Sequence, residues 1–278
     1  MGANGVKIEK REIASLGELH ALLAETRALR ADIVAKMAGG DEASASDADS
    51  LENVQKSLEE IATHDGRPVL DIALGGSLGI DLDHEIGELK KDIFFLRYDE
   101  DPFLVLLATQ NQGFYAEVNT VEHALDGKQF NVWLTSLDGT VVPPCLHSNV
   151  SGQSAYSALW MTRFARALTQ TSVVITPPPG HEVDALGSQD FELEDDFAFL
   201  EQSHRLDLSS GPLLTSGCSP GDLVLVRTGM YNCPETWAVF VTTDPGLEEE
   251  VRALCPNVVI ASSPDVFVAA LNQLALKA

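Results

Sequence analysis

Residues 237–274 read WAVFVTTDPGLEEEVRALCPNVVIASSPDVFVAALNQL, and the pattern in this stretch indicates the fold class most clearly. Two apolar runs, Trp237–Thr242 and Asn257–Ala261, have the length and the β-branched content of buried strands. Each run is followed closely by a cap residue and a proline, Asp244-Pro245 and Ser263-Pro264, a pattern that starts a helix. Strand, helix, strand and helix with short joins predict a βαβα unit with parallel strands.

The middle of the chain has a different pattern, in which short apolar runs are separated by turn residues. The predicted strands there are Val69–Leu74, Ile93–Arg97, Phe103–Ala108, Phe114–Val118 and Phe130–Leu134. Closely spaced strands with short turns pair antiparallel, so we expect an antiparallel middle section. One helix, Asp81–Lys91, is predicted to interrupt it, and a second, Gly152–Leu168, to follow it.

The N-terminal part is predicted to be helical. Apolar residues recur at helical spacing over Glu12–Met37, and Gly39-Gly40 ends that helix. The run Asp41–Ser50 is interpreted as a flexible acidic linker, and a second helix is expected over Leu51–Ile61 with Ser50 as its N-cap. The two helices form either a hairpin docked on the body, which we prefer, or a detachable arm.

The chain as a whole is therefore predicted to be a mixed α/β protein with three segments. These are a helical N-terminal element with an acidic linker (1–65), an α+β domain (66–180), and an acidic loop with the C-terminal α/β unit (181–278). An alternative is that the last two segments share one sheet.

The charge of the chain excludes some classes of ligand. With 18 basic against 42 acidic residues, the formal net charge is −24 at pH 7. Such a surface repels phosphate backbones and attracts cations, so nucleic acid is not an expected partner. No stretch approaches the ~20 apolar residues of a membrane span. Because Met1–Lys10 holds no apolar stretch of a signal peptide, we expect a cytoplasmic protein.

One acidic segment also carries aromatic residues and is the candidate binding surface. Its residues are Asp190, Glu192, Glu194, Asp195, Asp196, Phe197 and Phe199. Alternating acidic and aromatic side chains suit a segment that docks on a basic, apolar groove of a partner. The alternative is a solvated loop on the protein's own surface.

Candidate catalytic residues come from two places in the sequence. Cys145 and His147 are two residues apart in a predicted loop, where an imidazole can activate a thiol. Asp244 and Ser262 follow the two C-terminal strands, and α/β proteins hold ligands at the carboxyl ends of parallel strands. The alternatives are a coincidental Cys/His pair, and residues at helix starts that act only as caps.

Two further clusters suggest ligand binding less directly. Gly75, Gly76 and Ser77 follow a predicted strand and precede a helix, where backbone amides can hold an anion; an ordinary glycine turn is the alternative. The acidic residues between Asp81 and Glu88 are interpreted as a solvated helix face rather than a metal site. No metal and no cofactor are expected.

Two functions remain open at this point. The first is an acidic cytoplasmic protein-binding protein, such as an inhibitor, an immunity-type protein or an adaptor, which engages a basic protein partner. The second is an enzyme that acts on a small cationic or neutral metabolite at the carboxyl ends of the parallel strands. The sequence leaves open the partner's identity, the occurrence of catalysis and the oligomeric state.

Overall fold

The structure is a computed structural model of a mixed helix and strand protein. It describes residues 7–64, 67–71, 75–136, 153–176, 203–207, 237–242 and 258–278. The chain divides into two compact units, Met1–Phe103 with His147–Leu159, and Leu104–Leu146 with Trp160–Ala278. We call them the helical unit and the sheet unit.

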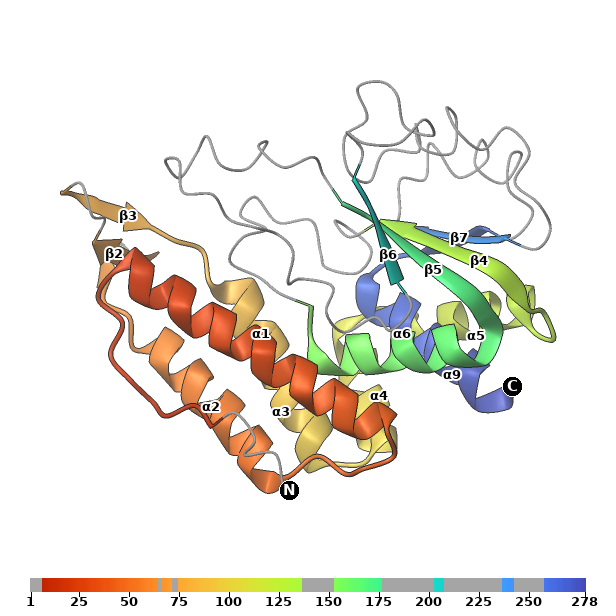
Figure 1. Ribbon diagram of the computed structural model, residues 1–278, viewed down its shortest axis with the longest axis horizontal. Coiled ribbons are helices and arrows are strands. Elements are labelled where there is room, and N and C mark those ends of the chain that lie inside the picture. The colour runs from red at the N-terminus through yellow and green to blue at the C-terminus, as the bar shows by residue number, and fades with distance from the viewer. Residues whose placement is uncertain are drawn as a thin grey trace. The chain divides into compact units, whose positions relative to one another are not determined.

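The helical unit is built on three helices and a small antiparallel sheet (Figure 1). Its elements are α1 (Leu16–Ala38), α2 (Ala45–Glu59), β1 (Thr63–His64), β2 (Arg67–Asp71), β3 (Ser77–Gly79) and α3 (Asp83–Arg97). Leucine, isoleucine and valine side chains of α1 and α2 form its core, and Leu19, Leu29, Ile33, Leu51 and Val54 are fully buried. α2 packs against both α1 and α3.

The two N-terminal helices begin at reciprocal capping boxes. The side chain of Ser15 caps α1 with Glu18, and that of Ser44 caps α2 with Asp47. The prediction of a flexible acidic linker was therefore wrong, because α2 starts inside this run. Ser50 is not a cap: it is a buried residue within the helix, and its hydroxyl donates to the carbonyl of Ser46 at 2.8 Å.

The small sheet has the strand order β1-β2-β3, and both pairs are antiparallel. It confirms part of the predicted strand Val69–Leu74, since β2 covers residues up to Asp71. Leu70 is buried, whereas its neighbours Val69 and Asp71 are not. This alternation gives the sheet one face towards the core and one towards solvent.

Three predicted strands of the middle section are helices instead. Residues 93–97 end α3, residues 103–108 lie in α4 (Glu100–Gln110), and residues 114–118 begin α5 (Phe114–Leu125). In α5 the residues Phe114, Val118, Val121 and Leu125 are buried at helical spacing. The antiparallel middle section was therefore wrong for this stretch, because a short apolar run does not distinguish a strand from one turn of a buried helix.

The sheet unit contains a five-stranded sheet in which all neighbouring strands pair in parallel. Its strands are β4 (Phe130–Ser136), β5 (Thr169–Thr176), β6 (Ser203–Asp207), β7 (Trp237–Thr242) and β8 (Val258–Ala261). The helices α5 and α9 (Pro264–Lys277) contact each other, and both contact β8 (Figure 1). In α6 (Ala155–Leu168), Trp160 and Phe164 are fully buried.

The C-terminal pattern is partly described by the structure. β7 and β8 pair in parallel, and α9 begins after the N-cap Ser263 with Pro264 in its first turn, as the sequence predicted. The helix predicted between β7 and β8, and with it the complete βαβα unit, lies outside the described residues. Within the described part of the chain, no helix has both the length and the apolar character needed to cross a bilayer.

Candidate functional site

The carboxyl edge of the parallel sheet is the candidate site that the topology defines. The strands end there at Ser136, Thr176, Asp207, Thr242 and Ala261. In the order β6-β5-β4-β7-β8, the chain passes from β4 to β5 and β6 on one side, and then returns to β7 and β8 on the other. The direction of winding thus reverses between β4 and β7. Open α/β sheets bind ligands at the carboxyl edge beside such a switch point.

The same edge holds a polar corner where β8 meets α9. The backbone amide and the hydroxyl of Ser262 both donate to the carboxylate of Glu117 on α5, with Oγ and Oε2 2.6 Å apart. Ser262 was a candidate catalytic residue, and the structure engages its hydroxyl with a carboxylate that accepts a proton. A hydroxyl that donates a hydrogen bond to a carboxylate is a geometry found in activated nucleophiles. The same hydrogen bonds also attach α5 to the start of α9.

A second set of side-chain hydrogen bonds stabilises the same corner. The hydroxyl of Ser263 accepts from the amide of Val266 at 3.3 Å, and it donates to Oδ1 of Asn111 at 2.7 Å. Asn111 in turn donates from Nδ2 to Oδ2 of Asp265 at 3.1 Å. Ser263 is therefore the N-cap that the sequence predicted, and the caps and amides around it hold the start of α9 in place.

The helical unit contains a buried ionic cluster that sequence reasoning missed. Arg30 of α1 pairs with Glu85 (Nη1 to Oε1, 2.8 Å) and with Asp92 (Nε to Oδ2, 2.7 Å), both on α3. Glu88 lies beside them and accepts from the hydroxyl of Tyr156 at 3.2 Å. No residue of this cluster is more than 7% exposed. The interpretation of residues 81–88 as a solvated acidic face was therefore wrong for Glu85 and Glu88.

The cluster has a structural role. Asp92 accepts from the amides of Ala155 and Tyr156 at 2.7 and 3.3 Å, so it caps the first turn of α6 from another helix. Burial raises the pKa of Asp92 to about 6, although the guanidinium of Arg30 opposes that shift. Burial alone lowers the pKa of Arg30, but the carboxylates of Glu85 and Asp92 outweigh it and raise that pKa. The sequence signal was a charged residue within the apolar stripe of α1, matched by carboxylates with i, i+3, i+7 spacing on α3.

The structure locates the glycine cluster and leaves other candidates undescribed. Gly75 and Gly76 have φ angles of 85° and 121°, and Ser77 begins β3. They therefore precede a strand, and α3 starts only at Asp83. The candidates outside the described residues are Cys145, His147, Asp244, Asp190, Glu192, Glu194, Asp195, Asp196, Phe197 and Phe199.

The described residues define a mixed helix and strand protein, with a five-stranded parallel sheet in one unit and helices with a small antiparallel sheet in the other. Two family models match this arrangement. Residues 15–104 match the trehalose-6-phosphate phosphatase N-terminal helical bundle domain. Residues 133–187 and 181–267 match the C-terminal domain of trehalose-6-phosphate phosphatase. The chain is thus similar to both domains of this phosphatase along most of its length.

Curated relatives come from the same area of metabolism. The chain is 27% identical over 192 residues to α,α-trehalose-phosphate synthase (UDP-forming) 2 of Caenorhabditis elegans, an alignment that covers 62% of this chain and 15% of the relative. It is 26% identical over 197 residues to α,α-trehalose-phosphate synthase (UDP-forming) 1 of Aphelenchoides avenae, covering 64% and 17%. The alignments thus span less than a fifth of the length of these relatives.

These matches correct the functional interpretation. They point to an enzyme of trehalose metabolism of the phosphatase type, and not to an acidic inhibitor, immunity-type protein or adaptor. The expected basic protein partner is wrong for the same reason, since the matched family suggests a sugar phosphate as the ligand. The open alternative of an enzyme was the better one, although its cationic or neutral substrate does not agree with a phosphate ester.

Proposed function

We propose that this protein is a trehalose-6-phosphate phosphatase-type enzyme that hydrolyses a phosphorylated disaccharide at the carboxyl edge of its parallel sheet. The observation that carries the proposal is that the strand order and the family match point to the same part of the chain. The switch point between β4 and β7 lies within the part of the chain that matches the phosphatase C-terminal domain. We also infer that residues 244–255 form the helix between β7 and β8, since Asp244-Pro245 is a helix-starting pattern.

Two aspartates are the proposed reactive carboxylates. Asp138 comes two residues after the last residue of β4, and Asp244 comes two residues after the last residue of β7. These are the two strands that flank the switch point. A carboxylate beside a phosphate ester serves as a nucleophile or as a general acid or base. Asp138 became a candidate only when the pairing identified β4 as the central strand.

The net charge of the chain is compatible with a phosphate substrate. Electrostatic attraction depends on the charges near the site, and several carboxylates of the described residues are already paired with cations. Arg30 neutralises Glu85 and Asp92, and Arg97 contacts both Asp49 and Glu52. The formal charge of −24 is a sum over the whole chain that already includes these arginines, so by itself it does not set the electrostatic potential that a phosphate meets at the sheet edge.

The test is the release of inorganic phosphate from trehalose 6-phosphate by the full chain in a buffer with Mg²⁺. We expect turnover by the wild type, and a decrease in kcat of about 10²-fold or more for Asp138→Asn and Asp244→Asn, because each removes a reactive carboxylate. Asp207→Asn is the matched control, since Asp207 ends the outer strand β6 at the same edge but away from the switch point. We expect that variant to keep its activity.

Two results would overturn the proposal. One is a folded wild-type chain that releases no phosphate above the blank at saturating substrate. The other is full activity in both aspartate variants, which would exclude the edge beside β4 and β7 as the reacting site. Circular dichroism and the thermal midpoint of each variant establish that the chain is folded in every assay.

A further inference from the structure

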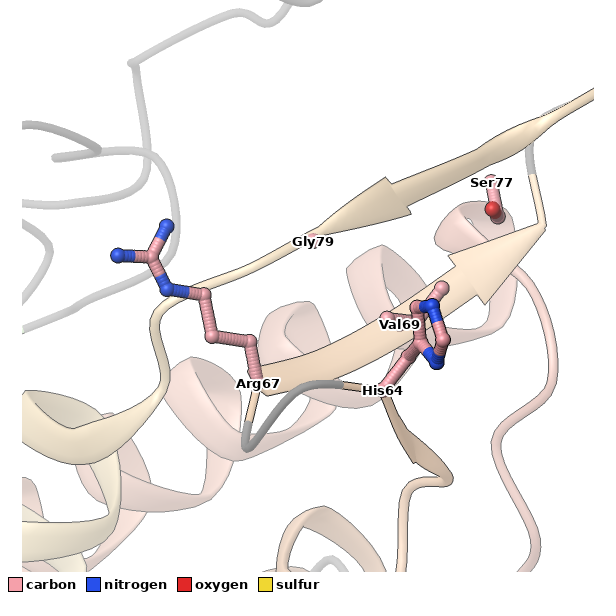
Figure 2. Close-up of a pocket in the computed structure, with 5 residues that line it drawn as sticks. All are labelled: His64, Arg67, Val69, Ser77 and Gly79. Carbon is pink, nitrogen blue, oxygen red and sulfur yellow. The ribbon is translucent and has the colours of Figure 1, made fainter.

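The solvent face of the small antiparallel sheet in the helical unit carries a shallow pocket of about 560 Å³. Its lining residues are His64, Arg67, Val69, Ser77 and Gly79 (Figure 2). Figure 2 shows Arg67 at one end of the pocket and Ser77 at the other, with His64 and Val69 between them. Pockets of this size accommodate small organic ligands.

The strand register explains why these residues share one face. His64 pairs with Arg67, and Val69 pairs with Gly79. Because side chains alternate along a strand, Arg67 and Val69 point to the same side of β2, whereas the buried Leu70 points to the core. Ser77 and Gly79 stand two residues apart on β3 and therefore belong to one face as well.

Gly79 is one of the lining residues and carries no side chain. Among the described residues, a Cβ atom built at Gly79 would meet only the carbonyl oxygen of Pro68, at 4.0 Å, and the φ angle of Gly79 lies outside the left-handed region. A larger residue at this position is thus sterically allowed and would fill the pocket. Beside Gly79, the side chain of Val69 supplies an apolar surface.

The polar groups of the pocket are suited to an anion. Arg67 offers a guanidinium fork, and among the described residues no carboxylate pairs with it, whereas Arg11, Arg30 and Arg97 all have such partners. His64 pairs with Arg67 through its backbone, and Figure 2 shows its imidazole beside Val69, whereas the guanidinium of Arg67 points away from it. Ser77 adds a hydroxyl at the far end. The one acidic residue of this face on β2 is Asp71, which pairs with Ser77 away from Arg67.

We propose that this pocket binds a small phosphate monoester with a hydroxylated body, such as a sugar phosphate. The phosphate lies against Arg67, because a guanidinium donates two parallel hydrogen bonds to phosphate oxygens. The body of the ligand lies over Val69 and Gly79 and reaches the hydroxyl of Ser77. The site belongs to the helical unit, so it is distinct from the reacting edge proposed for the parallel sheet.

The test measures binding of glucose 6-phosphate and of inorganic phosphate to the full chain, followed by the backbone amide signals of Val69 and Gly79 in NMR. We expect a dissociation constant of about 1 mM or tighter for the sugar phosphate, and weaker binding of inorganic phosphate, which lacks the body. Arg67→Gln should weaken binding about tenfold or more. Gly79→Val should abolish it by filling the hollow.

Control variants distinguish binding in this pocket from a general effect of charge and from binding at the parallel sheet. Arg11→Gln changes the net charge by the same amount but replaces an arginine that is paired with Glu25, so its binding should equal that of the wild type. Asp138→Asn and Asp244→Asn should leave the amide shifts unchanged, even if the proposed phosphatase activity fails. If inorganic phosphate and sugar phosphate bound with equal affinity, the body of the sugar would contribute nothing to binding. The pocket would then bind a free anion, which contradicts the proposed ligand class.

Three outcomes overturn the inference as a whole. These are no shift of the two amides at 10 mM sugar phosphate (about ten times the expected dissociation constant), unchanged affinity in folded Arg67→Gln, and binding that disappears only in the aspartate variants. The last result would place the anion at the parallel sheet. Because both Arg67 and Gly79 lie on the solvent face, at least one of the two pocket variants is expected to fold.

Discussion

Arg30 shows how one residue determines the interior of the helical unit. It lies on the buried side of α1, yet it is charged, and its two carboxylate partners come from α3. A buried ion pair contributes little against an apolar replacement of the whole group, but removing one partner leaves an uncompensated buried charge. The cluster therefore makes the docking of α1 on α3 specific.

We predict that Arg30→Met lowers the free energy of unfolding by roughly 3–5 kcal/mol, because Glu85 and Asp92 then remain buried without a counter-charge. Urea denaturation at neutral pH measures this change. Arg11→Met is the control, since Arg11 and Glu25 are partly exposed and such pairs contribute about 0–1 kcal/mol. A loss below about 1 kcal/mol for Arg30→Met would contradict the role assigned to the cluster.

The raised pKa of Asp92 predicts that its contribution to the stability of the folded chain decreases as the pH rises. Its pKa is about 6 in the folded chain against an ordinary value of 3.8, so between these values the folded state binds the extra proton. Its contribution to stability is complete below about pH 4 and is lost as the pH rises through about 6. The groups that act on it are Arg30 of α1, Glu88 of α3, and the backbone amides of Ala155 and Tyr156 in α6.

The measurement compares unfolding free energies of the wild type and Asp92→Asn from pH 4 to pH 7. The advantage of the wild type over the variant should fall by about 3 kcal/mol across this range and level off above it. Asp41→Asn, an exposed substitution after α1, should show no such slope relative to the wild type. A difference that rises with pH would mean that Arg30 outweighs burial at this carboxyl.

At the scale of elements, capping decides where α2 begins. The side chain of Ser44 accepts from the amide of Asp47, and the carboxylate of Asp47 accepts from the amide of Ser44 at 2.9 Å. This box starts a helix in a run of serine and aspartate that resembles a linker. Its apolar residues Leu51, Val54 and Leu58 are then buried, which stabilises the helix.

Replacing Ser44 with alanine should lower the free energy of unfolding by about 1 kcal/mol, because an amide of the first turn loses its acceptor. Chemical denaturation of the full chain measures the loss. Thr120→Ala on the exposed surface of α5 is the control, and it should change stability by less than about 0.5 kcal/mol. If the two variants were equally stable, the capping box would not hold the start of α2.

The same scale explains why the end of α3 was predicted as a separate strand. The buried positions of α3 are Glu85, Glu88, Leu89, Asp92, Ile93 and Phe95, which follow a helical period but include three carboxylates. A search for apolar periodicity does not detect such a stripe, because its charged members become favourable only when Arg30 is adjacent. In the sequence, the last residues of this helix therefore look like a separate apolar run.

For the whole molecule, total charge was a poor guide to function. The excess of acidic residues suggested a basic protein partner, whereas similarity over residues 15–104 and 133–267 points to a phosphatase-type enzyme of trehalose metabolism. Total charge governs solubility and long-range attraction, but a ligand responds to the few groups around it. Arg67 in the small sheet illustrates this point, because it is a local cation on a strongly acidic chain.

Local sequence was sufficient to predict the helices α1 and α9, the strands β4, β7 and β8, and the cap at Ser263. Each of these depends on neighbours in the chain: an apolar period, a cap residue or a following proline. The order of the parallel strands, the pairing of Arg30 with α3, and the contact of Ser262 with Glu117 join residues far apart in the sequence. These were decided only by tertiary packing, because their energy arises from burial and contact that the unfolded chain does not have.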